Sequence, residues 1–194
     1  MGAGYSHAIV LCEDGSVFTC GEHYGIGRNV TRHTTLTRLD SLQGRFVVDI
    51  AAGFYDGAAV CDDGTVFVWG DNHSRKLGVS GSPRTPVQVT ALSGEFITSV
   101  AIGYEQALFL TDDGRLYGCG YRRANGLNRN VSTPQLVTTL DGIPIAEITC
   151  GRFSGFARTM SGDVYSWGYS QVIGHGGAGK SLPTLVTNYR IINP

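Results

Sequence analysis

The fold is decided by residues 53–70, which begin Gly53-Phe54-Tyr55-Asp56 and end Val66-Phe67-Val68-Trp69-Gly70. Within this stretch, the second glycine of the pattern follows the first by 11 residues and the third follows it by 17. The same spacings recur from Gly4, Gly103 and Gly151, and the four starting glycines lie 49, 50 and 48 residues apart. A pattern that returns at a nearly fixed period indicates a repeat architecture.

Each copy of the pattern is typical of β-strands. Residues 58–69 predict a hairpin whose turn is Asp63-Gly64, because short runs of β-forming residues flank a turn dipeptide. Further strands are predicted at residues 87–89 and 96–102, and no segment has a sustained helical period. Four antiparallel strands in each of several copies are typical of the blades of a β-propeller.

We therefore expect an all-β fold, a β-propeller with four-stranded antiparallel blades, one for each of the four copies. A single partial propeller domain is predicted over residues 1–194, with repeats at approximately 1–52, 53–102, 103–150 and 151–194. The strand that should precede the first copy is expected to be missing, because Met1 lies only three residues before Gly4.

The repeats resemble those of the regulator of chromosome condensation family, whose members form seven-bladed β-propellers. The residues that carry the resemblance are His7 in the first copy and, in the second, Trp69-Gly70-Asp71-Asn72, Leu77-Gly78 and Pro86-Val87. Other copies depart from the family pattern. The histidine position holds Asp56, Gln106 and Ser154, and the tryptophan position holds Cys20 and Cys119.

Four copies are fewer than the family's seven, so we expect a partial ring rather than a tightly closed one. An open arc leaves two blade faces and two strand edges uncovered, which favours a partner that covers them. The predicted partner is a protein that completes or caps the propeller. The remaining blades could come from a second chain, from a symmetry mate or from residues outside this sequence.

The overall composition excludes several classes of protein. Fifteen Lys and Arg residues face 16 Asp and Glu residues, and a net charge of -1 argues against a protein that coats DNA. No apolar run is long enough to span a membrane, and the first residues carry no secretory signal. Five cysteines without metal-ligand spacing are typical of reduced thiols. We expect an intracellular protein, in a compartment that the sequence does not resolve.

The charges are unevenly distributed along each repeat. Ten of the 15 basic residues lie in the loops that follow the third glycine of a repeat, and this group includes Arg38 and Lys180. The Asp-Gly turns, which lie at the other end of the strands, are acidic. The candidate partner-binding residues on this basic face are Arg28, Arg32, Arg75, Lys76, Arg84, Arg122, Arg123 and Arg129. Arginine matches carboxylates and phosphates with two parallel hydrogen bonds, so the face suits an acidic protein surface or RNA. Solvated loops that simply tolerate arginine are the alternative.

No catalytic or cofactor site is predicted. The sequence contains no arrangement of His, Ser and carboxylate residues that suggests a nucleophile or an acid–base pair. Residues 174–181 fit the P-loop pattern, but the strand predicted after Pro183 stands where a phosphate-binding loop requires a helix. We therefore predict no cofactor, no metal and no enzymatic activity.

These observations favour a non-catalytic protein-interaction scaffold that is a subunit of a larger protein or ribonucleoprotein assembly. The resemblance implies an alternative, which is guanine nucleotide exchange on, or regulation of, a Ran-like small GTPase together with chromatin association. In the family this activity depends on a wedge that projects from one blade, and the even repeat spacing leaves no room for such an insertion. A third possibility, also implied by relatives, is an inhibitor or an accessory propeller of a ubiquitin ligase.

Overall fold

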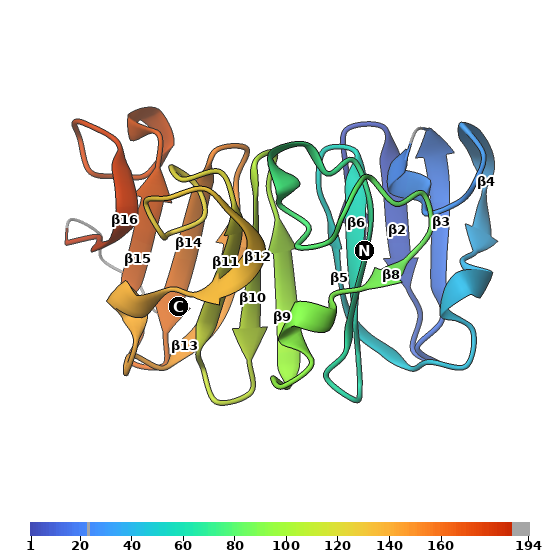
Figure 1. Ribbon diagram of the computed structural model, residues 1–194, viewed down its shortest axis with the longest axis horizontal. Helices are drawn as coiled ribbons and strands as arrows, with labels where there is room; N and C mark the ends of the chain where they lie inside the picture. Colours follow the sequence, from blue (N-terminus) through green and yellow to red (C-terminus); the bar gives the residue numbers. More distant parts are fainter. Residues whose placement is uncertain (23, 188–194) are drawn as a thin grey trace, which may run out of the picture.

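The structure, a computed structural model, describes residues 1–22 and 24–187. Its strands form four four-stranded antiparallel sheets, each of which is one blade (Figure 1). The first blade contains β1 (Gly2–Ala3), β2 (His7–Leu11), β3 (Val17–Glu22) and β4 (Arg32–Arg38), and the second contains β5 (Val47–Ala52), β6 (Asp56–Cys61), β7 (Val66–Gly70) and β8 (Val87–Gln88). The third contains β9 (Ile97–Ile102), β10 (Gln106–Thr111), β11 (Leu116–Gly120) and β12 (Val131–Leu136), and the fourth contains β13 (Ile145–Cys150), β14 (Ser154–Thr159), β15 (Val164–Gly168) and β16 (Lys180–Leu185).

Short 3-10 helices lie in the connections between strands. They are η1 (Tyr24–Ile26), η2 (Asp40–Leu42), η3 (His73–Arg75), η4 (Thr90–Leu92), η5 (Thr138–Leu140) and η6 (Ser170–Val172). None of the helices in the described ranges has the length and apolar character of a membrane-spanning segment.

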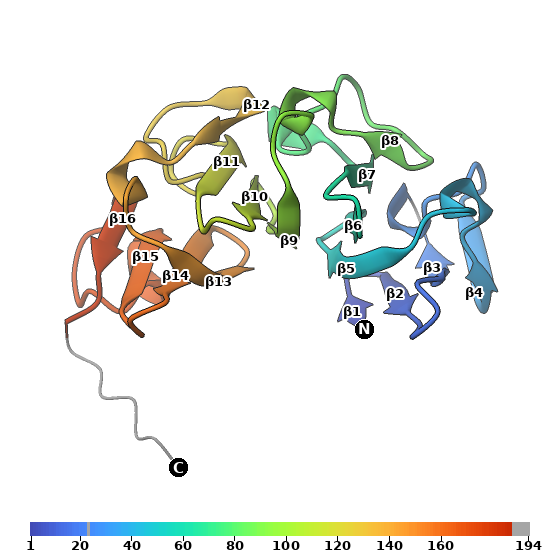
Figure 2. The ribbon, with the colours of Figure 1, turned by 90° about the horizontal axis from the view of Figure 1, so that it is seen from below.

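The sheets follow one another along an open arc and do not close into a ring, so the predicted partial propeller is confirmed (Figure 2). The blades are offset by one strand from the sequence repeats, since β5 comes before Gly53 but pairs with β6. One expectation was wrong: the strand before the first copy is present as β1. It is short, and it pairs Gly2 with Ile9 and Ala3 with Ala8.

The hydrophobic core lies between neighbouring blades. Ile9, Leu39 and Trp69 belong to one buried cluster, which joins the first blade to the second. Val68, Leu77 and Phe109 belong to the next cluster, and Leu108, Leu116 and Trp167 to the last. Each interior blade therefore buries both of its faces, whereas within the described residues the first and fourth blades each pack against one neighbour.

The third glycine of each repeat is required by the backbone. Gly70 has a φ of 106°, and a Cβ added there would lie 2.4 Å from the carbonyl oxygen of Tyr55. An L-residue would meet both the unfavourable φ and this close approach of the neighbouring turn. This explains why the glycine returns in every copy.

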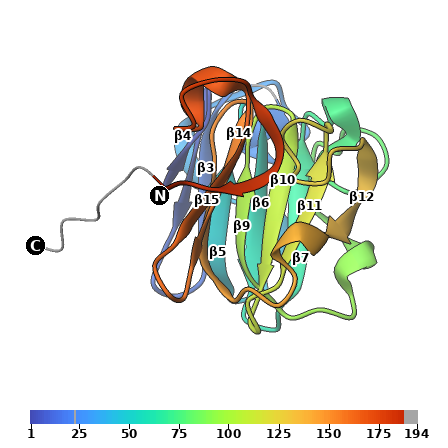
Figure 3. The same cartoon turned by 90° about the vertical axis from the view of Figure 1, so that its left-hand side faces the viewer.

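The strands run between two faces of the arc, as the end view in Figure 3 shows. We call the first the loop face. It carries the long loops after β3, β7, β11 and β15 together with the turns that precede β2, β6, β10 and β14. The rings of His73 and Tyr104, one from each kind of connection, lie 4.5 Å apart. The opposite side, the turn face, carries the Asp-Gly hairpin turns and η2, η4 and η5.

Candidate docking face

Neighbouring blades are joined by directional hydrogen bonds beneath the loop face. Gln106, at the histidine position of the repeat, donates Nε2–H bonds to the carbonyl oxygens of Gly151 (3.1 Å) and Ser154 (2.8 Å) in the following blade. In the opposite direction, the indole N–H of Trp69 donates to Gly25 in the preceding blade at 2.8 Å. Trp167 donates to Ala124 in the same way, also at 2.8 Å. The junctions are thus bonded in both directions: Gln106 bonds the following blade, and the two tryptophans, at equivalent positions, bond the preceding ones.

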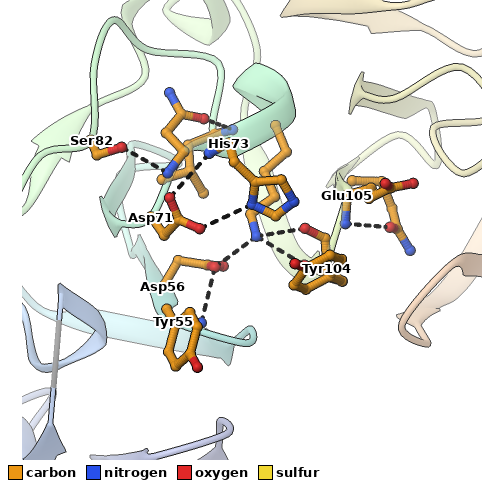
Figure 4. Close-up of polar contacts among 12 residues, drawn as sticks. Tyr55, Asp56, Asp71, His73, Ser82, Tyr104 and Glu105 are labelled. Carbon is orange, nitrogen blue, oxygen red and sulfur yellow. Dashed lines mark hydrogen bonds and ion pairs between the residues drawn. The ribbon is translucent and has the colours of Figure 1, made fainter.

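The second blade uses a different pair of residues for the same junction. Asp56 occupies the position of Gln106, but a carboxylate has no proton to donate to a carbonyl. Lys76 supplies the donor, and its Nζ lies 2.7 Å from Asp56 Oδ2, 3.2 Å from the Gly103 oxygen and 2.9 Å from the Tyr104 oxygen. Figure 4 shows Asp56 and Tyr104 on the two sides of this contact. Both charged side chains are fully buried.

Lys76 is therefore not on the partner-binding face, and that part of the sequence-based prediction was wrong. Lys76 occupies the position that Gly25, Ala124 and Val172 occupy in the other blades. In each blade this position lies two residues before a glycine with positive φ. In the first blade this space is taken by His7, because a Cβ on Gly25 would lie 2.4 Å from His7 Nδ1. The same space at the blade junction is thus filled in two ways. The second blade combines the short Asp56 with the long Lys76, and the first combines the bulky His7 with Gly25.

Burial shifts the pKa values at these junctions. The pKa of His7 is lowered to about 4, because burial disfavours the imidazolium, and a backbone contact with Asp56 offsets part of that effect. That contact falls outside hydrogen-bond geometry, and neither ring nitrogen has another partner in the described residues. Burial also raises the pKa of Asp56, against the opposing charge of Lys76.

Six of the seven candidate arginines, all except Arg28, lie on loops or strand ends at the loop face, whereas the half-buried side chain of Arg28 extends toward the turn-face end of β4. Two of them connect neighbouring blades: Arg84 lies over the Tyr24 ring at 4.6 Å, and Arg123 over the Tyr169 ring at 5.4 Å. Arg28 donates to the backbone oxygens of Thr37 and Arg38, Arg32 pairs with Glu22 at 3.3 Å, and Arg129 donates to Gln135 Oε1. Arg75 and Arg122 have exposed side chains. Arg38, also assigned to this face from sequence, instead pairs with Phe18 near the turn face.

A further part of this face was not predicted from the sequence. Arg152 follows the first glycine of the fourth repeat and lies over the rings of Tyr104 (5.1 Å) and Phe153 (4.8 Å). These rings continue a series that we call the aromatic strip, consisting of Tyr5, Phe54, Tyr104, Phe153 and Tyr169. Consecutive ring centroids in this series lie 4.4, 5.0, 5.6 and 5.2 Å apart. The signal was present in the sequence as an aromatic within two residues of each starting glycine.

The turn face carries the acidic side chains, and many of them are occupied with local contacts. The side chain of Asp63 accepts hydrogen bonds from the N–H (3.0 Å) and the hydroxyl (2.5 Å) of Thr65 within its turn. Arg115 bridges Glu95 at 2.6 Å and Asp113 at 2.7 Å. Hydrogen bonds from Tyr117 and Arg115 lower the pKa of Glu95. These carboxylates stabilise the hairpins and are ionised at neutral pH.

The structure also places the remaining chemical motifs of the sequence. Lys180, the lysine of the P-loop-like segment, begins β16 and not a helix. All five cysteines are free thiols, and burial raises the pKa of both Cys119 and Cys150 to about 12. Among residues 1–22 and 24–187, no group of three or more His, Cys, Asp or Glu side chains is arranged to hold a metal ion.

Repeated four-stranded blades, linked side by side through glycine, tryptophan and histidine-type positions, define a β-propeller repeat protein. Two family models, both described as the regulator of chromosome condensation (RCC1) repeat, match residues 63–110 and residues 1–26, 47–75 and 97–125. Together these matches include more than half of the chain. The protein belongs to the RCC1 repeat family. No curated protein sequence matches this chain.

Solved structures share the same fold. Human WBSCR16 matches with a TM-score of 0.87 and 23% identity over 95% of this chain and 52% of that one. Prp20p from Saccharomyces cerevisiae, described with its binding to Gsp1p and histones, matches at 0.77 and 24% over 95% and 49%. Yeast RCC1 (Prp20) bound to Kap60 matches at 0.76 and 23% over 95% and 48%. The chain therefore spans about half the length of these proteins.

Proposed function

We propose that this protein is a non-catalytic interaction scaffold, a subunit of a larger assembly, which docks an anionic partner surface through the arginines of its loop face. The observation that carries the proposal is the position of six exposed arginines at one end of the blades, namely Arg32, Arg75, Arg84, Arg122, Arg123 and Arg129. Loops held by a rigid sheet framework are common sites of recognition. Carboxylates and phosphates both match the planar donor fork of arginine.

The charge distribution around these arginines supports the proposal. On the same face, Glu22 is paired with Arg32, Asp71 Oδ2 contacts His73 Nδ1 at 3.0 Å, and Lys76 neutralises Asp56 beneath the surface. The exposed guanidinium groups of Arg75, Arg122 and Arg123 have no carboxylate partner within the described residues. Their donors are therefore available to a ligand.

Reversing charge on this face is expected to weaken polyanion binding. The triple variant Arg122→Glu, Arg123→Glu, Arg129→Glu should elute from immobilised heparin at a clearly lower salt concentration than the unmodified chain, because fewer cations then release counterions. Heparin carries neither bases nor peptide, so it reports the electrostatics of the face alone. The matched control is Arg38→Glu, Arg45→Glu, Arg158→Glu, which changes the net charge equally away from the loop face. Equal elution of the two triple variants would contradict the proposal.

Nucleotide exchange on a Ran-like small GTPase, with chromatin association, is the second candidate. It is favoured by the shared fold with Prp20p, whose solved structure is described with its binding to Gsp1p and histones. Adding the purified chain in catalytic amounts to such a GTPase loaded with a fluorescent GDP analogue separates the two functions. Acceleration of GDP release would replace the scaffold role by exchange, and an unchanged rate would support the scaffold role.

The same proposal includes further blades of this type on the two open sides of the arc. At the first blade, Cys20 occupies the position from which Cys119 donates its Sγ–H to the Arg75 oxygen of the preceding blade at 3.3 Å. At the fourth blade, Ser154 occupies the position from which Gln106 bonds the following blade. Both positions thus match those that join blades inside the arc.

Among the residues that the structure describes, the first and fourth blades each leave one face unpacked, whereas the interior blades bury both faces. We therefore expect the purified chain to associate with itself. Light scattering is expected to give a mass well above the 20.7 kDa of one copy. Mixing with a separately purified set of RCC1-type blades serves as a comparison. A stable monomer that does not bind the added blades would contradict this part of the proposal.

A further inference from the structure

We propose that the aromatic strip binds single-stranded nucleic acid, with bases stacking on its rings and phosphates contacting the surrounding arginines. This inference rests on the anionic docking proposed above and names the class of partner. It begins from the position of the strip, which runs across all four blades on the loop face. Its members come from the turns before β2, β6, β10 and β14, and from the loop after β15.

The strip is accessible at its two ends. Tyr5 in the first blade is 67% exposed, and Tyr169 in the fourth is 37% exposed. Between them, Phe54, Tyr104 and Phe153 are half-buried. Tyr5, Phe54, Tyr104 and Arg152 also line an open hollow of about 280 Å³. A ligand with flat apolar groups can therefore reach ring surface at several points along one path.

Arginine side chains lie beside the rings of the aromatic strip, and this combination indicates the class of ligand. Arg152 is exposed and lies within 6.0 Å of three ring centroids, those of Phe54, Tyr104 and Phe153. Arg123 lies over Tyr169 at the end of the strip, and His73 contacts Tyr104. Interleaved aromatic and arginine side chains bind single strands, because every base has a face that stacks and every nucleotide has a phosphate.

Two other anionic partners fit less well. A duplex keeps its bases stacked on one another, so it can use the arginines but not the rings. An acidic protein surface offers carboxylates to the arginines and likewise leaves the exposed Tyr5 and Tyr169 rings without a matching group. An unpaired strand uses both components of the face, because each nucleotide supplies a stacking base and a phosphate.

The test is fluorescence anisotropy with fluorescein-labelled oligonucleotides of 12 uridines and of 12 deoxyuridines, which differ only in the 2′-hydroxyl and so show whether the sugar matters. The double variant Tyr5→Ala, Tyr169→Ala is expected to weaken binding by about tenfold or more, as the loss of a stacked base contact does elsewhere. The matched control is Phe46→Ala, Phe96→Ala, which removes two turn-face rings that are 47% and 46% exposed. It should bind like the unmodified chain. Tyr5→Trp, Tyr169→Trp should bind at least as well, because stacking surface is retained.

Several outcomes would overturn the inference. One is equal affinity of the alanine variant and the Phe46, Phe96 control. Others are equal affinity for a 12-base-pair duplex, or tighter ring-dependent binding of a ten-residue glutamate peptide. If heparin retention still depends on Arg122, Arg123 and Arg129 while the rings have no effect, the docking face stands and only the nucleic-acid partner fails. If neither set of variants changes any binding, both proposals fail. Thermal melts of every variant confirm that the fold is intact.

Discussion

Replacing Asp56 by alanine is expected to destabilise the protein by about 3–5 kcal/mol, among the largest effects of any single substitution here. Among the described residues, the variant leaves the Lys76 ammonium fully buried with two backbone carbonyls and no carboxylate in contact with it. The desolvation of an unpaired charge outweighs the hydrogen bonds that remain. Urea unfolding followed by circular dichroism measures the effect, with Asp62→Ala in an exposed turn as the control.

The same experiment has a designed rescue. The double variant Asp56→Gln, Lys76→Ala gives the second blade the residues that the third blade has at these positions, Gln106 and Ala124. The glutamine is expected to donate to the carbonyls of the third blade, as Gln106 does to Gly151 and Ser154. Most of the lost stability should therefore return. A double variant as unstable as Asp56→Ala, or an Asp56→Ala variant no less stable than the control, would contradict this account of the junction.

The second large effect is expected at His7 and depends on pH. His7→Gln should stabilise the chain by about 2 kcal/mol more at pH 5 than at pH 8, because the histidine has a folded pKa of about 4 and an ordinary value of 6.5. The unfolded chain binds a proton at His7 between these two values and the folded chain does not. The stability that neutral His7 provides is therefore complete above the ordinary pKa and is lost as the pH falls toward 4.

The comparison must be made between variants, since other groups titrate in the same range. Asp56, whose pKa is raised, contributes a slope of opposite sign, which is common to both proteins and cancels in the difference. Glutamine is the appropriate replacement because it does not titrate and occupies the same position in the third blade. Urea midpoints at pH 5, 6, 7 and 8 give the result. Parallel pH profiles for the two proteins would show that His7 is not held in its neutral form.

Much of the fold could be predicted because glycine spacing is a backbone constraint. Gly70 and its equivalents adopt positive φ beside a neighbouring carbonyl, and this requirement is visible in every copy whatever the surrounding residues are. The one-strand offset between the blades and the sequence repeats was harder to predict from the sequence. Nothing in the sequence of residues 47–52 says whether this strand pairs backward with the first repeat or forward with β6.

The candidate face was predicted less completely, because a count of charges by loop ignores burial and register. Lys76 was counted as a surface cation, although its partner Asp56 stands 20 residues earlier in the same blade. Arg38 lies at the far end of its strand, where it pairs with Phe18. Arg152 was overlooked because it lies in a short inner turn and not in one of the long loops. Asp56 and Lys76 both differ from the residues at the same positions of the other repeats. Considering these two differences as a pair would have predicted the buried contact between them.

The junction bonds that Trp69, Lys76 and Gln106 donate to a neighbouring blade all end on main-chain carbonyls, among them those of Gly25, Gly103 and Gly151. Every residue type carries that group, so the receiving blade need not share any particular side chain with the donating one. A duplicated or transplanted blade brings its own donors and finds acceptors already present beside it. Tandem copies of this unit can consequently diverge independently, gain members or change order while the contacts between them persist.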